Sequence, residues 1–286
     1  MDHISLAYHT ITWRDDIPKA LEDIASAGFR AFETFSFPPL TGDTWQGYVD
    51  RLTRAYRERP ETYLETRSYR TPDELMTLAR RYGLRLIAMY CSGRFIDPAL
   101  AEIEIRAILA AARFVAAAGG DYLVLGGGMN DRGVYADRDY GCLAETLHAI
   151  GHGCRALGLQ ACYHPHSGTL VETPEQLERF CAATDPDLIA LALDVAHLAR
   201  GRADPVTALR RWAARIRYIH LKDIRDDAFV ELGQGEVDLP GAVAVLREIG
   251  YRGWAVVELD DSQRTPAQSA AISHRYLEED LGLTAG

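Results

Sequence analysis

The chain has 286 residues, of which 48% are hydrophobic and 25% are charged, so it can bury a substantial core as one α/β barrel or as two smaller domains. Its formal net charge of −10 argues against a nucleic-acid partner, because phosphate contacts need clustered Lys and Arg and no basic run occurs. A small neutral or polar ligand is easier to accommodate.

The five cysteines lack C-x-x-C spacing, and an odd number cannot all pair within one chain. This pattern favours free thiols in a reducing compartment. The N-terminal sequence has no basic region followed by an apolar one, and no apolar stretch approaches the length of a membrane span. We therefore expect a cytoplasmic protein with no membrane partner.

Strand-like and helix-like segments alternate along the chain, as in the βαβ units of a parallel sheet. Short runs of aliphatic and β-branched residues predict eight strands, at 4–8, 31–35, 85–91, 121–126, 159–164, 189–194, 216–220 and 254–259. Apolar residues at spacings of three and four predict helices at 17–27, 71–82, 99–118, 140–157, 174–183, 205–214, 240–249 and 266–281. Eight such repeats predict an α/β fold, a single (β/α)8 TIM barrel spanning residues 1–286.

Residues typical of helix starts recur once per predicted strand–helix repeat. Thr-Pro pairs precede the helices of TPDEL, TPEQLE and TPAQSA, where the hydroxyl can cap the first turn and Pro suits the first helical position. No linker or composition shift divides the chain, which favours one domain. The long segment 36–71 is an exception, rich in aromatic and charged residues. We predict an extended loop and helix insertion there that partly covers the barrel mouth, while an insertion that only packs at the periphery fits equally well.

Four strand-like runs in the second half end in groups that can bind a metal: ACYHPH (161–166), ALALDVAH (190–197), IRYIHLKD (216–223) and WAVVELD (254–260). Their end residues are His164, Asp194, His220 and Glu258. In a (β/α)8 barrel the carboxyl ends of the strands converge on one face, where the chemistry takes place. The sequence therefore predicts a metal site at the barrel mouth.

The donor set mixes imidazole and carboxylate, which suits Mn, Co, Fe or Zn, whereas oxygen ligands alone would favour Mg or Ca. Each residue has a simpler interpretation: a hydrogen-bonded His, a helix cap at Asp194, a solvated charge at Glu258. That all four residues have only these structural roles is less plausible, since burying polar groups directly after buried strands costs free energy unless they are paired or metal-bound.

Further polar residues lie close in sequence to the four candidate metal ligands. His166 and His197 are candidates for substrate or proton-transfer roles, and Lys222 can hydrogen-bond a substrate oxygen or, with its pKa depressed by a nearby cation, exchange protons. An ion pair of Lys222 with Asp223 or another acid is equally consistent with the sequence.

Other positions give weaker candidates for substrate binding. They are His9, Glu33 and Tyr90, at the ends of the first three strands, and Arg225, which with Arg94 is the only visible clamp for a substrate carboxylate. Each taken alone is more easily explained as structural. The triple glycine at 126–128 is not a nucleotide-binding fingerprint, and Asp238 is predicted to cap a helix.

The motifs follow one another in the order His164, Asp194-x-x-His197, His220-Leu-Lys222-Asp223, GQGEVD, EIGYRGW and VVELD. This order resembles the xylose isomerase-like TIM barrels of sugar isomerases and epimerases over nearly the whole chain, from Ile4 to Leu281. Within that family the second half most resembles the inosose dehydratases, on the segments YHPHSGTLVET, HLKDIR and YRGWAVVELD.

The resemblance implies a divalent metal, usually manganese or cobalt, with zinc, iron or magnesium as further options. It implies His164, Asp194, His220 and Glu258 as the ligands. Keto-sugar epimerases have Glu at the strand-five position, and His164 stands there in this chain, which favours a dehydratase; His166 is the alternative ligand. Family members are often dimers or tetramers, so a homo-oligomer is an open expectation that no surface pattern decides.

The leading hypothesis is removal of a proton α to a carbonyl, followed by loss of a β-hydroxyl as water, from a keto-polyol such as an inosose. Lys222, His166, His197 and Glu258 are the candidates for moving protons. A dehydroshikimate-like ring acid is a second possible substrate. The alternatives are a keto-sugar isomerase or epimerase using the same enediolate, a nuclease, which the negative charge disfavours, and a non-catalytic sugar-binding or partner subunit.

Overall fold

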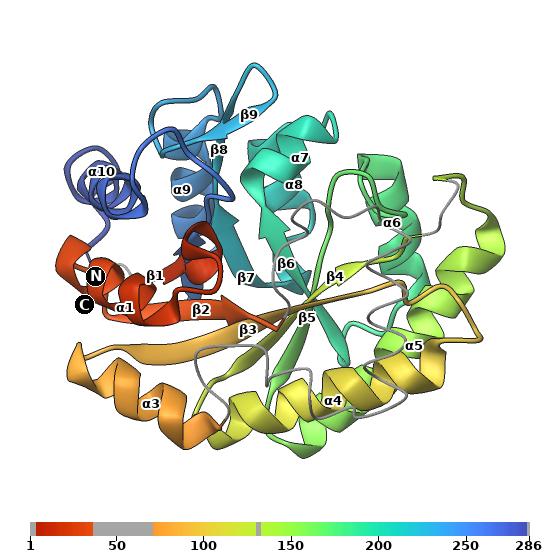
Figure 1. Ribbon diagram of the computed structural model, residues 1–286. Helices are drawn as coiled ribbons and strands as arrows, with labels where there is room; N and C mark the ends of the chain where they lie inside the picture. Colours follow the sequence, from red (N-terminus) through yellow and green to blue (C-terminus); the bar gives the residue numbers. More distant parts are fainter. Residues whose placement is uncertain (1–3, 37–70, 130–132, 285–286) are drawn as a thin grey trace.

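The computed structural model describes residues 4–36, 71–129 and 133–284. Eight parallel strands close into a barrel in the order β1-β10-β7-β6-β5-β4-β3-β2, with helices around the outside (Figure 1). The barrel strands are β1 Ser5–His9, β2 Ala31–Phe35, β3 Arg85–Gly93, β4 Tyr122–Gly127, β5 Gln160–His164, β6 Ile189–Asp194, β7 Ile216–Leu221 and β10 Trp254–Val257. The predicted (β/α)8 TIM barrel is confirmed.

The helices follow the predicted segments closely. They are α1 Ile17–Ala27, α3 Pro72–Arg81, α4 Ala101–Ala117, α5 Asp137–Ala156, α6 Pro174–Ala183, α8 Pro205–Arg211, α9 Leu239–Glu248 and α10 Pro266–Glu279. Thr71, Thr173 and Thr265 each accept a hydrogen bond from the backbone N–H three residues on, and each completes a reciprocal capping box. Asp238 caps α9 as predicted, accepting from the N–H of Gly241 at 2.8 Å.

Among the α-helices and β-strands of the described residues, three were not predicted. A six-residue helix, α7 Val195–Arg200, begins directly after β6, and a two-stranded hairpin, β8 Asp223–Arg225 and β9 Ala228–Val230, follows β7. The hairpin turns at Asp226 and Asp227, whose φ angles of 48° and 61° are both positive, as a two-residue type I′ connection requires. Elements this short show no readable periodicity in the sequence.

Mostly small residues, together with Tyr218, fill the barrel interior below its mouth. Alternate side chains of a strand point to the same face, so a residue two positions before a mouth residue lies inside the barrel beneath it. These inner positions form one buried cluster that includes Ala7, Ala31, Ala88, Val124, Cys162, Ala192, Tyr218 and Val256. A larger apolar cluster lies between the strands and the helices. The alternation thereby directs His9, Glu33, His164, Asp194, His220 and Glu258 inward.

The predicted insertion at 36–71 falls on positions 37–70, outside the described residues. Within the part of the chain that is described, no helix combines the length and the apolar character needed to cross a membrane.

Candidate metal centre

Four potential ligands converge at the carboxyl ends of neighbouring strands. His164 of β5, Asp194 of β6, His220 of β7 and Glu258, directly after β10, offer one ligand atom each, and these atoms all lie within 4.8 Å of one another. All four side chains are buried. The structure therefore brings together the residues that the sequence predicts as metal ligands.

Asp194 combines the two roles that the sequence left open. Its Oδ1 accepts hydrogen bonds from the backbone N–H groups of Ala196 at 2.8 Å and His197 at 2.9 Å, which caps the first turn of α7. Its Oδ2 is buried and has no hydrogen-bond partner among the described residues. Capping fixes the carboxylate and leaves one oxygen directed to the centre. Burial raises the pKa of Asp194 to about 6, against the opposing effect of Lys222.

His220 is held from behind by Glu33. Its Nε2 lies 2.7 Å from Oε2 of Glu33, which also accepts the hydroxyl of Tyr218 at 3.0 Å. The other ring nitrogen, Nδ1, lies 3.0 Å from Oε2 of Glu258. A histidine tied through one nitrogen to a carboxylate and presenting the other is the usual arrangement of a metal ligand.

Charges around the centre shift the ionisation of its members in opposite directions. Burial opposes a charge on His220, but Glu33 and Glu258 outweigh it and hold its pKa well above the usual value. Burial likewise opposes the charge on Glu258, yet Lys222 and His220 hold its pKa well below the usual value. Burial and the neighbouring His220 lower the pKa of His164, so that imidazole stays neutral.

These donors fit a divalent cation. The buried Nδ1 of His164 and Oδ2 of Asp194 lack a hydrogen-bond partner in the described part of the chain, whereas Nδ1 of His220 and Oε2 of Glu258 lie 3.0 Å apart as an ion pair. Unpaired buried polar atoms are costly, and a cation shared by the four residues would satisfy His164 and Asp194. A mixed nitrogen and oxygen set is compatible with Mn, Co, Fe or Zn.

Lys222 lies beside the centre and is fully buried. Its Nζ is 2.6 Å from Oδ2 of Asp260, 3.6 Å from Oε1 of Glu258 and 4.0 Å from the centre of the Phe229 ring. Burial would lower its pKa, but Asp260 and Glu258 raise it instead. A pKa depressed by a bound cation beside Lys222 stays a prediction.

The acid that pairs with Lys222 is Asp260, not Asp223. The Asp223 carboxylate instead accepts backbone N–H groups from four residues: Ile224, Gly233, Gly235 and Val237. Asp260 was missed in the sequence, although its position two residues after Glu258 was a usable signal. Asp223 anchors the loop that follows the β8–β9 hairpin.

The remaining candidates fall into two groups. His9, Glu33 and Tyr90 line the β1–β3 side of the centre: Nε2 of His9 lies 4.0 Å from Oε1 of Glu33, and the Tyr90 ring meets the His164 ring edge-on with centroids 5.7 Å apart. His166 and His197 lie on the other side, with ring centroids 3.9 Å apart. Arg225 is exposed on β8.

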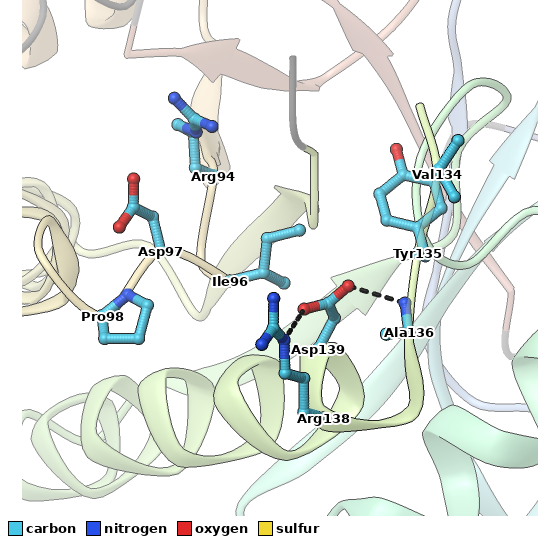
Figure 2. A pocket seen from close by; sticks show the side chains of 9 residues that line it. All are labelled: Arg94, Ile96, Asp97, Pro98, Val134, Tyr135, Ala136, Arg138 and Asp139. Atoms are coloured by element: carbon cyan, nitrogen blue, oxygen red, sulfur yellow. Dashed lines mark hydrogen bonds and ion pairs between the residues drawn. The ribbon is translucent and has the colours of Figure 1, made fainter. Parts of the chain in front are cut away.

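Arg94 belongs to a separate pocket of about 500 Å³ between the segments that follow β3 and β4 (Figure 2). Its backbone N–H donates to Glu104, 2.6 Å away, and Figure 2 shows Asp97, Tyr135 and Arg138 around the same pocket. None of the four candidate ligands lines it.

Comparison with known proteins points to one family. The family model described as xylose isomerase-like TIM barrel matches residues 21–280. An inosose dehydratase of Geobacillus kaustophilus (strain HTA426) is 30% identical over 237 residues, which cover 72% of this chain and 75% of that protein. Further inosose dehydratases align over little more than half of their own length, 57% and 59% in two cases.

Solved structures share the fold at low sequence identity. A sugar phosphate isomerase/epimerase from Parabacteroides distasonis ATCC 8503 superimposes with a TM-score of 0.72 at 21% identity, covering 97% of this chain and 94% of that one. The IOLI protein with a bound zinc atom superimposes with a TM-score of 0.73 at 16% identity, covering 98% of both chains.

Proposed function

Since the chain belongs to the xylose isomerase-like TIM barrel family, we propose that it is a divalent-metal-dependent dehydratase acting on a keto-polyol such as an inosose. The observation that carries the proposal is the convergence of four buried donor atoms next to a buried lysine. The similarity to an inosose dehydratase over 237 residues supports this substrate class.

His164, Asp194, His220 and Glu258 would hold the metal, and the zinc atom bound by the IOLI protein supports metal binding in this fold. When bound, the ion would polarise the substrate ketone and stabilise the negative charge that develops on its oxygen. Manganese and cobalt are our first choices for its identity, with zinc, iron and magnesium as alternatives.

We assign the proton transfers to His166, His197 and Lys222. Burial lowers the pKa of His166 and of His197, which keeps both imidazoles neutral and able to accept the proton from the α-carbon. Lys222 is held protonated by Asp260, so it can donate a proton to the β-hydroxyl as the carbon–oxygen bond breaks and water leaves. Glu258 remains a further candidate for proton transfer.

Substrate hydroxyls would meet the β1–β3 side of the mouth. Nε2 of His9 and Oε1 of Glu33 are buried without hydrogen-bond partners in the described ranges, and Tyr90 lies beside them. We assign substrate binding to these three residues and, from the exposed hairpin, to Arg225. The five unpaired cysteines support a cytoplasmic location.

A keto-sugar isomerase or epimerase is the second candidate function, supported by the name of the Parabacteroides neighbour. It would use the same enediolate and return the proton instead of expelling hydroxide. His164 counts against epimerisation, because the resemblance implies a glutamate base at that position in keto-sugar epimerases.

The reaction product distinguishes a dehydratase from a keto-sugar isomerase or epimerase. Manganese-loaded protein incubated with an inosose should generate a conjugated, UV-absorbing dione, and chelation of the metal should abolish the signal. Epimerisation would consume the substrate without UV absorption. If neither reaction occurs with the metal bound, the non-catalytic sugar-binding or partner role replaces the enzyme.

A further inference from the structure

A second group of potential ligands adjoins the first. His164, His166 and His197 each offer a ring nitrogen, and these three atoms all lie within 4.8 Å of one another. Two of the three imidazoles, His166 and His197, are not members of the four-residue centre. His164 and His166 lie at the end of β5 and just after it, and His197 lies on helix α7.

Ser167 orients both of these rings. Nδ1 of His166 lies 2.8 Å from the carbonyl oxygen of Ser167, so this nitrogen carries the proton and Nε2 keeps its lone pair. Nδ1 of His197 lies 3.0 Å from the Oγ of the same serine, whose backbone N–H also donates to this nitrogen at 3.5 Å. Metal-binding histidines usually donate one ring N–H to an oxygen, as His166 does here, and bind the ion through the other nitrogen.

The remaining nitrogen of His197 is the second observation that indicates a ligand. The His197 side chain is 3% exposed, and its Nε2 has no hydrogen-bond partner among the residues described. The His166 and His197 rings stack at 3.9 Å with an interplanar angle of 37°, a geometry in which neither ring donates to the other. A buried nitrogen that lacks a partner beside two further imidazoles is the environment that a soft cation would satisfy.

The charge of Lys222 does not exclude a cation there. Asp260, 2.6 Å from Nζ, and Glu258, 3.6 Å away, offset the ammonium charge locally. His166 is only partly buried, which gives an ion a route of entry.

From these contacts we infer that His166 and His197, with His164 as the third ligand, form a second cation position that accepts zinc-like ions. Three imidazoles without a carboxylate bind Zn, Co, Ni or Cu in preference to Mn or Mg. An imidazole ring has two nitrogens, so His164 serves both positions once its N–H proton is released.

The second position gives zinc a regulatory effect, a consequence that rests on the proposed function. An ion bound to His166 and His197 occupies the lone pairs that would accept the substrate proton. Excess zinc therefore inhibits a manganese-loaded enzyme, whereas excess manganese does not.

Metal stoichiometry tests the site without an activity assay. Metal-free protein is titrated with Zn²⁺ or with Mn²⁺ in a calorimeter, and the bound metal is counted by mass spectrometry after dialysis. We expect two zinc ions but one manganese ion per chain. His166→Ala should bind one zinc and still one manganese, and the retained manganese shows that this variant is folded.

His152→Ala is the matched control, since His152 is exposed on α5 and its loss should leave two zinc ions. One zinc ion in the unaltered protein overturns the inference, as do two zinc ions in His166→Ala, which would place the second ion elsewhere. Two zinc ions in this titration, together with absence of dehydration by the manganese-loaded protein without zinc, would instead contradict the proposed function alone.

Discussion

The two sides of the barrel mouth differ in how their polar groups are satisfied. On the side of β2, β7 and β10, charged groups hold one another: Glu33 holds His220, and Glu258 and Asp260 hold Lys222. On the side of β5 and α7, three imidazoles lie together and burial disfavours a charge on each. The first side therefore carries charged groups, and the second side stays neutral. This division suits a metal and a proton donor on the first side and a proton acceptor on the second.

The largest expected effect comes from removing the histidine at the middle of the charged side. His220→Ala leaves Glu33 and Glu258 facing each other without the imidazole between them. We expect loss of bound manganese, a fall in dehydration rate of roughly 10²–10³-fold, and a loss of about 3–5 kcal/mol of unfolding free energy. Metal analysis and urea unfolding measure these effects. Unchanged manganese content would show that the charged side does not hold the metal.

Lys222 tests whether the charged side also supplies a proton. Lys222→Met removes the ammonium group that lies between Asp260 and Glu258, and kcat should fall by about 10²–10⁴-fold while the metal stays bound. Lys222→Arg, which keeps the charge, is the control and should keep manganese at the level of the unaltered protein. Equal losses of metal and activity in Lys222→Met would assign the lysine a role in metal binding instead.

Glu33 separates positioning from substrate binding. Glu33→Gln keeps an acceptor for Tyr218 but removes the charge behind His220, so the affinity for manganese should fall by about 10–100-fold. Calorimetric titration with Mn²⁺ measures this. A raised KM at saturating manganese, with unchanged metal affinity, would make Glu33 a substrate-binding residue alone.

The neutral histidines on the side of β5 and α7 should make the free energy of unfolding depend on pH. Burial lowers the pKa of His197 in the folded state, so the unfolded chain binds the proton more readily. The stability that the neutral ring supports is present above the unfolded pKa of about 6.5 and is lost as pH falls below it, by at most about 1.4 kcal/mol per pH unit.

His197→Asn should therefore flatten the decline in unfolding free energy of the metal-free protein between about pH 6.5 and 5. Urea unfolding at a series of pH values provides the measurement. A decline as steep as that of the unaltered chain would mean that His197 is not held neutral. This is the smallest of the expected effects.

Much of this arrangement could be predicted from the sequence because the strands alternate regularly. The limits of β2, β6, α1 and α6 coincide with the predicted ones. Because the carboxyl ends of barrel strands converge on one face, the sequence also predicted that His164, Asp194, His220 and Glu258 lie together. Thr-Pro pairs marked helix starts because capping is a local interaction between residues three apart.

The contacts that tune the site could not be predicted, because they join residues distant in sequence. Glu33 meets His220 across 187 positions, and nothing local to either residue specifies that contact. The acid that pairs with Lys222 could not be identified for the same reason. Helix α7 and the β8–β9 hairpin could not be predicted because they are too short to show a periodic pattern. Whether His164 or His166 supplies the strand-five ligand stays a prediction, since the structure brings both close to His197.

The most direct test of the account is to identify the product that the manganese-loaded protein forms from an inosose by proton NMR. The account predicts a product one water molecule lighter, with a carbon–carbon double bond conjugated to the carbonyl group. A product of unchanged mass, inverted at the carbon next to the carbonyl, would contradict dehydration and establish epimerisation in its place.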